Sequence, residues 1–277
     1  MPLVFGMVLK ILFNPASDGI SISGALIYFT IPMPIQDLPI TESQVNSAIV
    51  IITIFFLCLY FTHGLTVKAE LKRQHIAEFI VKQTKSLVKT NMSDYFSGFA
   101  PFIGAIMGLS AFSSLLSLIG LYAPTSDINI VGGWAILVFI LISYYKMKCG
   151  PLHYAKSFGD PVPLLSPLNI ISEVATPVSM AFRHYGNVLS GAVISVLVAT
   201  GLQGLSHLLL GWLPGLLGDI PFLQIGIPAV LSIYFDVFSG CLQAFIFAML
   251  TMLYVASGFP EEDYFARKAR KLQKSKN

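Results

Sequence analysis

Five apolar stretches, each long enough to cross a bilayer as a helix, constrain this sequence more than any other feature. The first runs from about Val45 to Val67 and contains no Asp, Glu, Lys or Arg, and about 20 apolar residues suffice for one crossing. The others are Phe99–Leu121, Ile128–Tyr145, Leu164 to about Thr200, and Phe222 to about Ala256. The last two are too long for one upright crossing, so they tilt or begin with a flat segment. We predict an all-α integral membrane protein with about five membrane crossings, the last two helices long and tilted.

The composition agrees with a membrane protein and excludes most soluble functions. Of 277 residues, 55% are hydrophobic and 11% are charged, whereas soluble domains carry about 25% charged residues. The net charge of +3 is too small to indicate a nucleic-acid partner. Three cysteines without ligand spacing indicate no metal site and no disulfide framework. No phosphate-binding loop, HExxH helix or nucleophile elbow occurs in the sequence, so we expect neither a cofactor nor covalent chemistry.

Charge and hydropathy divide the chain into three parts. We expect residues 1–44 to form an outer or interfacial segment beginning with a short surface helix, residues 45–257 one membrane domain, and residues 258–277 a charged cytoplasmic tail. Within the membrane domain, residues 68–92 alternate basic and apolar residues, which predicts an amphipathic helix on the inner membrane surface. A solvated helical hairpin is the alternative for that segment.

The positions of the basic residues predict the orientation in the membrane. With the N-terminus outside, three inner segments (Lys68–Lys89, Lys146–Lys156 and Arg267–Lys276) hold 15 of the 17 Lys and Arg residues. Cytoplasmic loops are enriched in these residues, so we predict an external N-terminus and a cytoplasmic C-terminus. The exceptions are Lys10 and Arg183.

Arg183 is the only Lys or Arg between Leu164 and Leu210, inside an apolar stretch. A guanidinium at the centre of a bilayer costs roughly 2.5–3.5 kcal/mol on insertion scales. It cannot escape this cost by losing its proton. We therefore interpret Arg183 as a functional residue rather than a packing residue.

Polar residues follow one face of the helix that carries Arg183. Thr176, Ser179, Asn187 and Ser190 lie seven or four residues before or after it and share its face. This pattern predicts a polar ion pathway. A polar seam that holds neighbouring helices together is the alternative.

A second polar stripe is expected on the last helix. Ser232, Asp236, Ser239 and Gln243 are spaced by four, three and four residues, which places them on one face of an α-helix. Asp236 can take up and release a proton, and Gln243 is suited to positioning a partner. The alternative for Asp236 is a wetted helix end without a role.

Four more residues near these stripes are left with two interpretations. Glu173 lines an aqueous vestibule or simply lies at the inner surface. Asp127 and Asn129 line the outer mouth of a path, or Asp127 is the N-cap of the following helix. His184 is interpreted as a structural hydrogen-bonding residue rather than a proton relay.

The residues around Arg183 resemble a known family. Pro177–Asn187 resembles the signature P-x-S-x-x-x-R-L-x-G-N of subunit a of F-type ATP synthases. Pro124–Asn129 is similar to the outer-loop motif of that family, Pro163–Asn169 to the lead-in of its Arg helix, and Gln243–Tyr254 to its final helix. These segments run in the family order from about Ala123 to Ser257.

The resemblance implies a membrane stator beside a rotating ring of c subunits, assembled with peripheral stalk b subunits in a bacterial plasma membrane. Two offset half-channels would carry protons or sodium ions. The essential Arg of the family falls on Arg183 and its Gln partner on Gln243; channel-lining positions fall on Ser179 and Asn187, and an ionisable outer position on Asp236. This sequence departs from the family pattern at two positions. Relatives often carry an acid or His at the position of Ala192, and a Leu at the position of His184.

Two other functions are consistent with some of these features. A stand-alone secondary transporter is the first alternative, although such folds usually show internal repeats and we find none between the halves. An intramembrane enzyme that uses Asp236 as an acid is the second, with Glu173 as its sole candidate partner.

Overall fold

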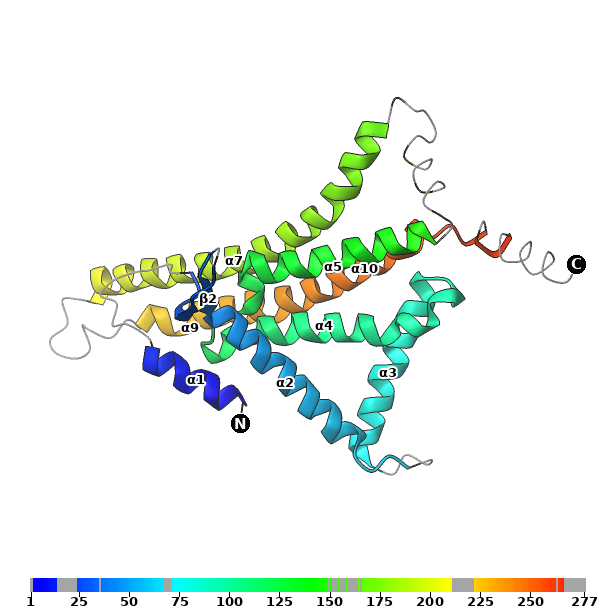
Figure 1. Cartoon of the computed structure of the whole chain (residues 1–277). Coiled ribbons are helices and arrows are strands. Elements are labelled where there is room, and N and C mark those ends of the chain that lie inside the picture. Colours follow the sequence, from blue (N-terminus) through cyan, green and yellow to red (C-terminus); the bar gives the residue numbers. More distant parts are fainter. Residues whose placement is uncertain are drawn as a thin grey trace, which may run out of the picture.

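The structure is a computed structural model of the whole chain (Figure 1). It describes residues 2–13, 24–34, 36–66, 71–148, 166–210, 222–262 and 264–266, together with Gly150, Tyr154, Phe158 and Leu164. The basic residues Lys68 and Lys156, the lead-in at Pro163 and the tail from Arg267 onward lie outside the described residues.

Five helical spans of the described residues are long and apolar enough to cross a membrane, which confirms the predicted fold class. The first span is α2 (Glu42–Thr62) and the second combines η1 (Asp94–Phe99), α4 (Ala100–Leu115) and η2 (Leu116–Ile119). The short η3 (Pro124–Ser126) then leads into α5 (Ile128–Met147). The fourth span is α7 (Ser166–Leu210), and the fifth joins α9 (Phe222–Ser232), η5 (Ile233–Ser239) and α10 (Gly240–Gly258).

The main core lies where α4, α5, α7 and α10 meet. Ile103, Val138 and Met252 are fully buried there. Small residues allow two of the closest approaches: a Cβ added to Gly240 would lie 2.7 Å from Ser114 Cβ, and one added to Gly191 would lie 3.0 Å from Phe235 Cβ. Small residues at such crossings are typical of helix packing in lipid.

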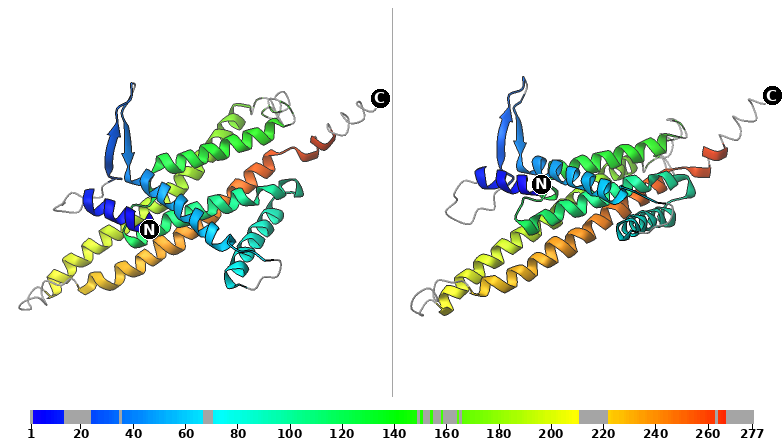
Figure 2. Two further views of the ribbon diagram at one scale, coloured as in Figure 1. Left: turned by 60° about the horizontal axis from the view of Figure 1, so that its bottom comes forward. Right: turned by 90° about the horizontal axis from the view of Figure 1, so that it is seen from below.

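The fourth span is too long to cross upright, as predicted from the sequence. α7 has 45 residues and contains Pro177, so at about 1.5 Å per residue it measures about 68 Å, against about 30 Å of hydrocarbon. Its first part leans away from the bundle, and the remainder runs beside α9 and η5 (Figures 1 and 2). Proline inside a helix removes a backbone hydrogen bond and causes such a bend.

The predicted amphipathic segment is helical. α3 (Lys72–Asn91) runs crosswise to α4, α5 and α10 and joins the end of α2 to the start of η1 (Figure 1). Its C-terminal half packs on α4, with Val88 fully buried and Thr84 Cγ2 3.5 Å from the Cβ position of Gly104. The C-terminal half of α3 is thus anchored on α4, whereas Ile76, Phe79 and Ile80 are exposed on its N-terminal half.

The N-terminal segment contains a hairpin that the sequence did not lead us to expect. The predicted surface helix is α1 (Pro2–Phe13), and its Gly6 lies against α2, where an added Cβ would be 2.9 Å from Ile49 Cδ1. Strands β1 (Ile27–Ile31) and β2 (Leu38–Thr41) pair antiparallel, with Phe29 opposite Ile40. β-Branched and aromatic residues favour this conformation. The hairpin and the C-terminal end of α10 lie toward opposite ends of the bundle (Figures 1 and 2).

The segment after α10 begins with docked aromatic residues. Phe259 is buried and stacks on Tyr95 of η1 with ring centroids 4.5 Å apart. The Lys148 ammonium lies over the Tyr95 ring and donates a hydrogen bond to its hydroxyl group. Burial lowers the pKa of Lys148, but the hydrogen bond and charge of Tyr95 outweigh it, so the net shift is upward. The start of the predicted tail is therefore held against the bundle.

We predict that Gly240→Ala weakens the packing of α4 on α10. The added methyl group overlaps Ser114 Cβ, and overpacking of this kind costs about 1–3 kcal/mol. Thermal unfolding of the purified chain in detergent measures the loss. Gly133→Ala on α5 is the matched control, because no side chain lies within 4 Å of the added Cβ. Equal unfolding temperatures for the two variants would contradict the prediction.

Candidate functional site

Arg183 lies on the outer surface of the chain within the fourth span. Its side chain is exposed, and no hydrogen bond or ion pair joins it to any residue that the structure describes. Ser179 and Ser190, which were predicted to share its face, are exposed as well. The guanidinium is therefore available to a group outside this chain.

The adjoining face of α7 is fixed by contacts with three neighbouring helices. His184 is fully buried, with Nε2 3.1 Å from Ser110 Oγ on α4. Its ring packs edge-on against Trp134 of α5 and Phe247 of α10, with centroids 6.0 and 5.6 Å away. This agrees with the structural interpretation of His184. Because consecutive helical residues point about 100° apart, burying His184 directs Arg183 away from the core.

Asn187 joins the Arg helix to the last span. Its Nδ2 donates to Ser239 Oγ at 2.8 Å, and Ser239 Oγ donates to Asn187 Oδ1 at 3.1 Å. His184, Asn187 and Gly191 are spaced by three and four residues, so one face of α7 makes all three inward contacts. The predicted site residues Asn187 and Ser239 are thus in direct contact.

Asp236 lies in a π-helical segment that the sequence pattern did not reveal. Residues Ile233–Ser239 form η5, and Gly240 N–H donates to Phe235 O, five residues earlier. Ser232 Oγ donates a hydrogen bond to Asp236 Oδ2. π-Helical turns are rare and are found frequently at functional sites. The carboxylate is half-buried.

The predicted single stripe on the last helix is interrupted as a result. The prediction assumed a regular α-helix, but a π-helix winds more residues into each turn, which rotates Gln243 relative to Asp236. Gln243 is 4% exposed, whereas Ser232, Asp236 and Ser239 are half-buried. Ser232 faces Asp236, Ser239 faces α7, and Gln243 lies in the core.

Glu173 occupies a small polar cavity at the other end of the site. Its carboxylate is 3.1 Å from Lys146 Nζ and accepts a hydrogen bond of 2.9 Å from the Tyr154 hydroxyl. The cavity has a volume of about 120 Å³ and is also lined by Thr176 and Ser257. Burial, and then the hydrogen bond and charge of Glu173, raise the pKa of Tyr154. Glu173 therefore lines a cavity in which its charge is compensated.

Asp127 is the N-cap of α5, which was one of its two predicted roles. Its Oδ1 accepts a 2.9 Å hydrogen bond from Asn129 N–H, and its Oδ2 accepts one of 2.5 Å from Ser43 Oγ of α2. Burial, followed by the charge of Asp127, raises the pKa of the neighbouring Tyr122 hydroxyl. The side chain of Asn129 is exposed.

Several buried polar residues near this end were missed by the sequence analysis. Glu42 and Asn46 of α2 are almost fully buried. Glu42 Oε1 accepts a hydrogen bond of 3.3 Å from Tyr122 N–H, and Asn46 Nδ2 donates one of 2.8 Å to the Tyr122 carbonyl. Ser114 Oγ lies 3.4 Å from Thr125 Oγ1, and both residues are buried. The sequence does show polar residues at the start of the first span, which could have indicated these buried contacts. Polar residues are also common at an ordinary helix N-terminus, so they were not singled out.

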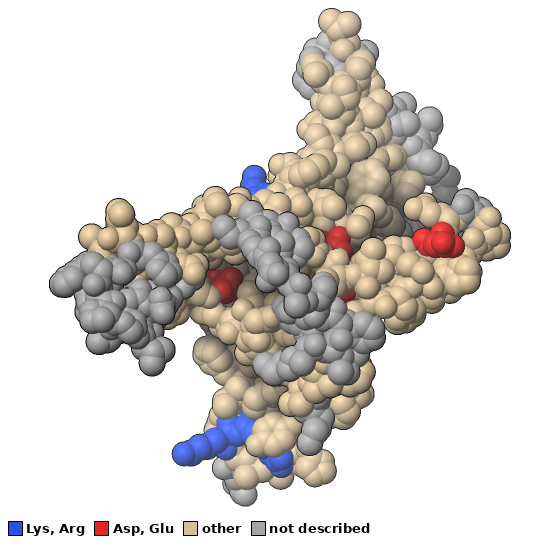
Figure 3. All heavy atoms as spheres, turned by 90° about the vertical axis from the view of Figure 1, so that its left-hand side faces the viewer, with Lys and Arg blue, Asp and Glu red and all other residues tan. Residues whose placement is uncertain are grey.

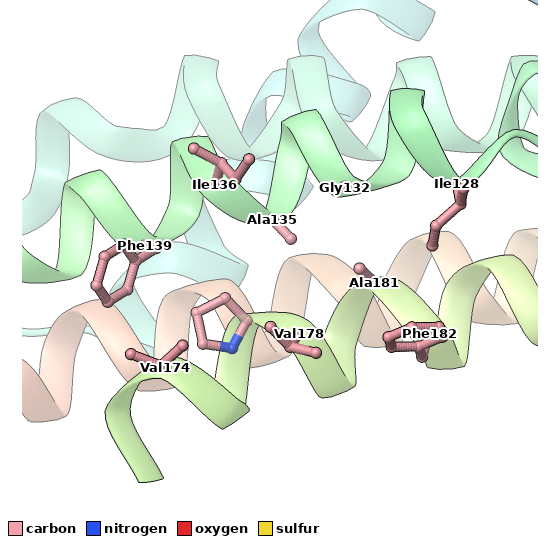
Figure 4. Close-up of a pocket in the computed structure, with 10 residues that line it drawn as sticks. Ile128, Gly132, Ala135, Ile136, Phe139, Val174, Val178, Ala181 and Phe182 are labelled. Atoms are coloured by element: carbon pink, nitrogen blue, oxygen red, sulfur yellow. The ribbon is translucent and has the colours of Figure 1, made fainter. Parts of the chain in front are cut away.

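The groove between α5 and α7 is apolar and carries no candidate for ion transfer. It has a volume of about 280 Å³ and lies between Ala135, Ile136 and Phe139 on α5 and Val174 and Val178 on α7 (Figure 4). All ten of its lining residues have apolar side chains or none. Along this groove the described residues of α5 and α7 make only apolar contacts, and a polar contact between these two helices is the pair of Lys146 and Glu173.

Comparison with known proteins gives one consistent result. The sequence pattern of a family described as "ATP synthase A chain" matches residues 45–256. The chain is 30% identical to "ATP synthase subunit a 1" of Crocosphaera subtropica over 71% of this chain and 77% of that protein. It is 27% identical to "ATP synthase subunit a" of Legionella pneumophila strain Paris over 81% of this chain and 89% of that protein. For the Priestia megaterium protein of the same name, the identity is 31% over 80% of this chain and 94% of that protein.

We predict that Asn187 and Ser239 stabilise the fold as a coupled pair. Interhelical hydrogen bonds in membranes couple by about 0.6 kcal/mol on average and reach about 1.7 kcal/mol. A double-mutant cycle with Asn187→Ala and Ser239→Ala, followed by unfolding in mixed micelles, should give a coupling energy in this range. Additive effects of the two substitutions would show that the contact contributes nothing.

Proposed function

Because the chain belongs to the ATP synthase A chain family, we propose that it forms the stationary ion path of the membrane sector and works against a rotating ring of c subunits. The family places the chain in the membrane sector of an ATP synthase as a subunit without its own catalytic site. The observation that carries the finer proposal is Arg183, an exposed cation within a membrane span, without a partner among the described residues.

In the proposed mechanism, a carboxylate of the ring passes Arg183 in the course of each step. A nearby cation favours the charged form of a carboxyl group, so the ring site releases its ion as it arrives. A protonated site is not attracted in this way and cannot pass directly between the two half-channels without first losing its proton. The low dielectric constant of the interface strengthens the attraction, while the delocalised, weakly hydrated charge of arginine suits a transient contact.

The two half-channels are proposed to approach Arg183 from opposite ends of α7. Asp236, Ser232, Ser239 and Asn187 supply polar groups on the side of η5, and we assign them to the outer path. The cavity of Glu173, Thr176 and Ser257 lies toward the other end of α7, and we assign it to the inner path. This assignment adopts an external N-terminus and a cytoplasmic C-terminus, as the distribution of basic residues predicts.

We propose the proton as the transported ion. Asp236 is a single carboxylate with a hydroxyl donor beside it, an arrangement that can take up and release one proton. The peripheral stalk b subunits are proposed as further partners on the basis of the family alone. ATP-driven acidification of vesicles that persists without sodium and is insensitive to its addition supports the proton; strict dependence on sodium would overturn that assignment.

We predict that Arg183→Ala abolishes coupled transport in the assembled complex. Without the cation, nothing forces a ring site to release its ion at this position, so ATP hydrolysis drives no acidification. Fluorescence quenching of a pH probe in inverted vesicles measures the loss. Val196→Ala, on an exposed position of the same helix, is the control and should pump normally. Normal pumping by the Arg183 variant would disprove the proposed role.

We predict that Asp236→Asn reduces proton pumping and that Asp236→Glu restores much of it. The amide keeps the size and the hydrogen bond to Ser232 but cannot exchange a proton, whereas glutamate retains the titratable group. Pumping rates measured against external pH separate this effect from a loss of assembly. An Asn variant with the wild-type rate and pH profile would remove Asp236 from the outer path.

A further inference from the structure

A groove lies in the elbow between the end of α2 and the start of α3. Its volume is about 520 Å³, within the range of about 300–1,000 Å³ that small-molecule sites occupy. The lining residues, which define the elbow groove, are Thr62, Leu65, Thr66, Gln74, Ala77, Glu78, Val81, Lys82 and Lys85. The groove is separate from both proposed half-channels, because none of its lining residues lies on α7, η5 or α10.

The α3 residues of the elbow groove form one helical face. Gln74, Ala77, Val81 and Lys85 follow the spacing of three or four residues that aligns side chains along a helix. The ammonium groups of Lys82 and Lys85 have no ion pair with any carboxylate of the described chain. Basic side chains gather at the tip of the molecule where α2 ends and α3 begins, on a surface that is otherwise largely uncharged (Figure 3).

The floor of the elbow groove is held in place by hydrogen bonds. Gln74 is 4% exposed, and its Nε2 donates to Thr66 O at 2.7 Å and to Glu78 Oε1 at 2.9 Å. Its Oε1 lies 3.3 Å from Thr66 N and accepts from it. The groove is therefore preformed, and the one carboxylate that lines it is turned toward Gln74 rather than toward the lysines.

The walls of the elbow groove are apolar and open toward the side. Leu65 and Val81 line it and are 56% and 51% exposed. On the adjoining face of α3, Phe79 is 64% exposed and Ile80 is 52% exposed. Exposed apolar residues beside lysines on a helix that runs crosswise to the spans place α3 at the level of the lipid headgroups. An apolar wall below two ammonium groups matches the chemistry of a phospholipid.

We propose that the elbow groove binds one anionic phospholipid, with its phosphate between Lys82 and Lys85 and an acyl chain along Leu65 and Val81. Basic residues beside the end of a membrane span attract anionic lipids. A zwitterionic lipid offers the same chain but carries a cation that opposes the lysines. The bound lipid would contact the segment that follows α2 through Leu65 and α3 through Val81 and the two lysines, and so join the two helices.

The test is lipid retention by the full chain, purified in detergent with a mixture of phosphatidylglycerol and phosphatidylcholine and examined by native mass spectrometry. The wild type should retain one phosphatidylglycerol in preference to phosphatidylcholine. The double substitution Lys82→Gln and Lys85→Gln should weaken retention about tenfold or more, since each basic residue near the surface attracts the headgroup. The matched control, Lys72→Gln with Lys89→Gln, removes the same charge from the same helix outside the groove and should retain the lipid.

A second pair of variants separates a shaped site from diffuse attraction. Val81→Trp fills the apolar part of the elbow groove and leaves both lysines in place, so retention should fall; Ile76→Trp, on an exposed position outside the groove, should not change it. Far-UV circular dichroism confirms folding of all variants. The proposal would be overturned if retention followed net charge alone or if phosphatidylcholine were retained equally well. It would also be overturned if inorganic phosphate at equal concentration displaced the lipid, or if a protein helix occupied the groove in the assembled complex.

Discussion

The position of one cation on the surface of α7 depends on contacts made by the adjoining face of that helix. His184, Asn187 and Gly191 face inward and contact Ser110, Ser239 and Phe235, respectively. Each contact limits rotation of α7 about its axis. Because Arg183 is adjacent to His184, the direction of its side chain is set by the three inward-facing residues. The guanidinium is therefore kept out of the core. The packing of α4, α5 and α10 around His184 is in this sense part of the site.

Polar groups inside the bundle are arranged so that most of them bind one another. Ser239 is paired with Asn187, Asp236 with Ser232, and Glu173 with both Lys146 and Tyr154. Unpaired polar groups in lipid are costly, so such pairing is expected. Arg183 differs because it has no partner among the described residues. A permanent charge within a membrane span, left without a partner among the described residues, is a strong reason to look for its partner in a neighbouring subunit.

The membrane spans were predictable from the sequence, and Arg183 could be singled out as the candidate residue, because both depend on simple quantities. Runs without charge define the spans, and Arg183 is the single basic exception in its run. The π-helix at Ile233–Ser239 was not predictable, since no local pattern distinguishes it from an α-helix, and it altered the placement of Gln243. The hairpin and the burial of Glu42 were missed for a related reason, because both depend on tertiary contacts. The hairpin contacts α2, and Glu42 accepts a hydrogen bond from Tyr122 N–H. The N-cap role of Asp127 was one of two interpretations, and only the 2.9 Å contact to Asn129 N–H establishes it.

The edge-on contact of Trp134 with His184 gives this protein an optical handle. The chain has two tryptophans, Trp134 and Trp212, and the ring of the first lies 6.0 Å from the buried imidazole of His184, the residue next to Arg183. With Trp212 replaced by phenylalanine, the tryptophan fluorescence of the chain would come from one residue at the junction of α4, α5, α7 and α10. A change in the packing around His184 would then register as a change in emission, without any attached dye.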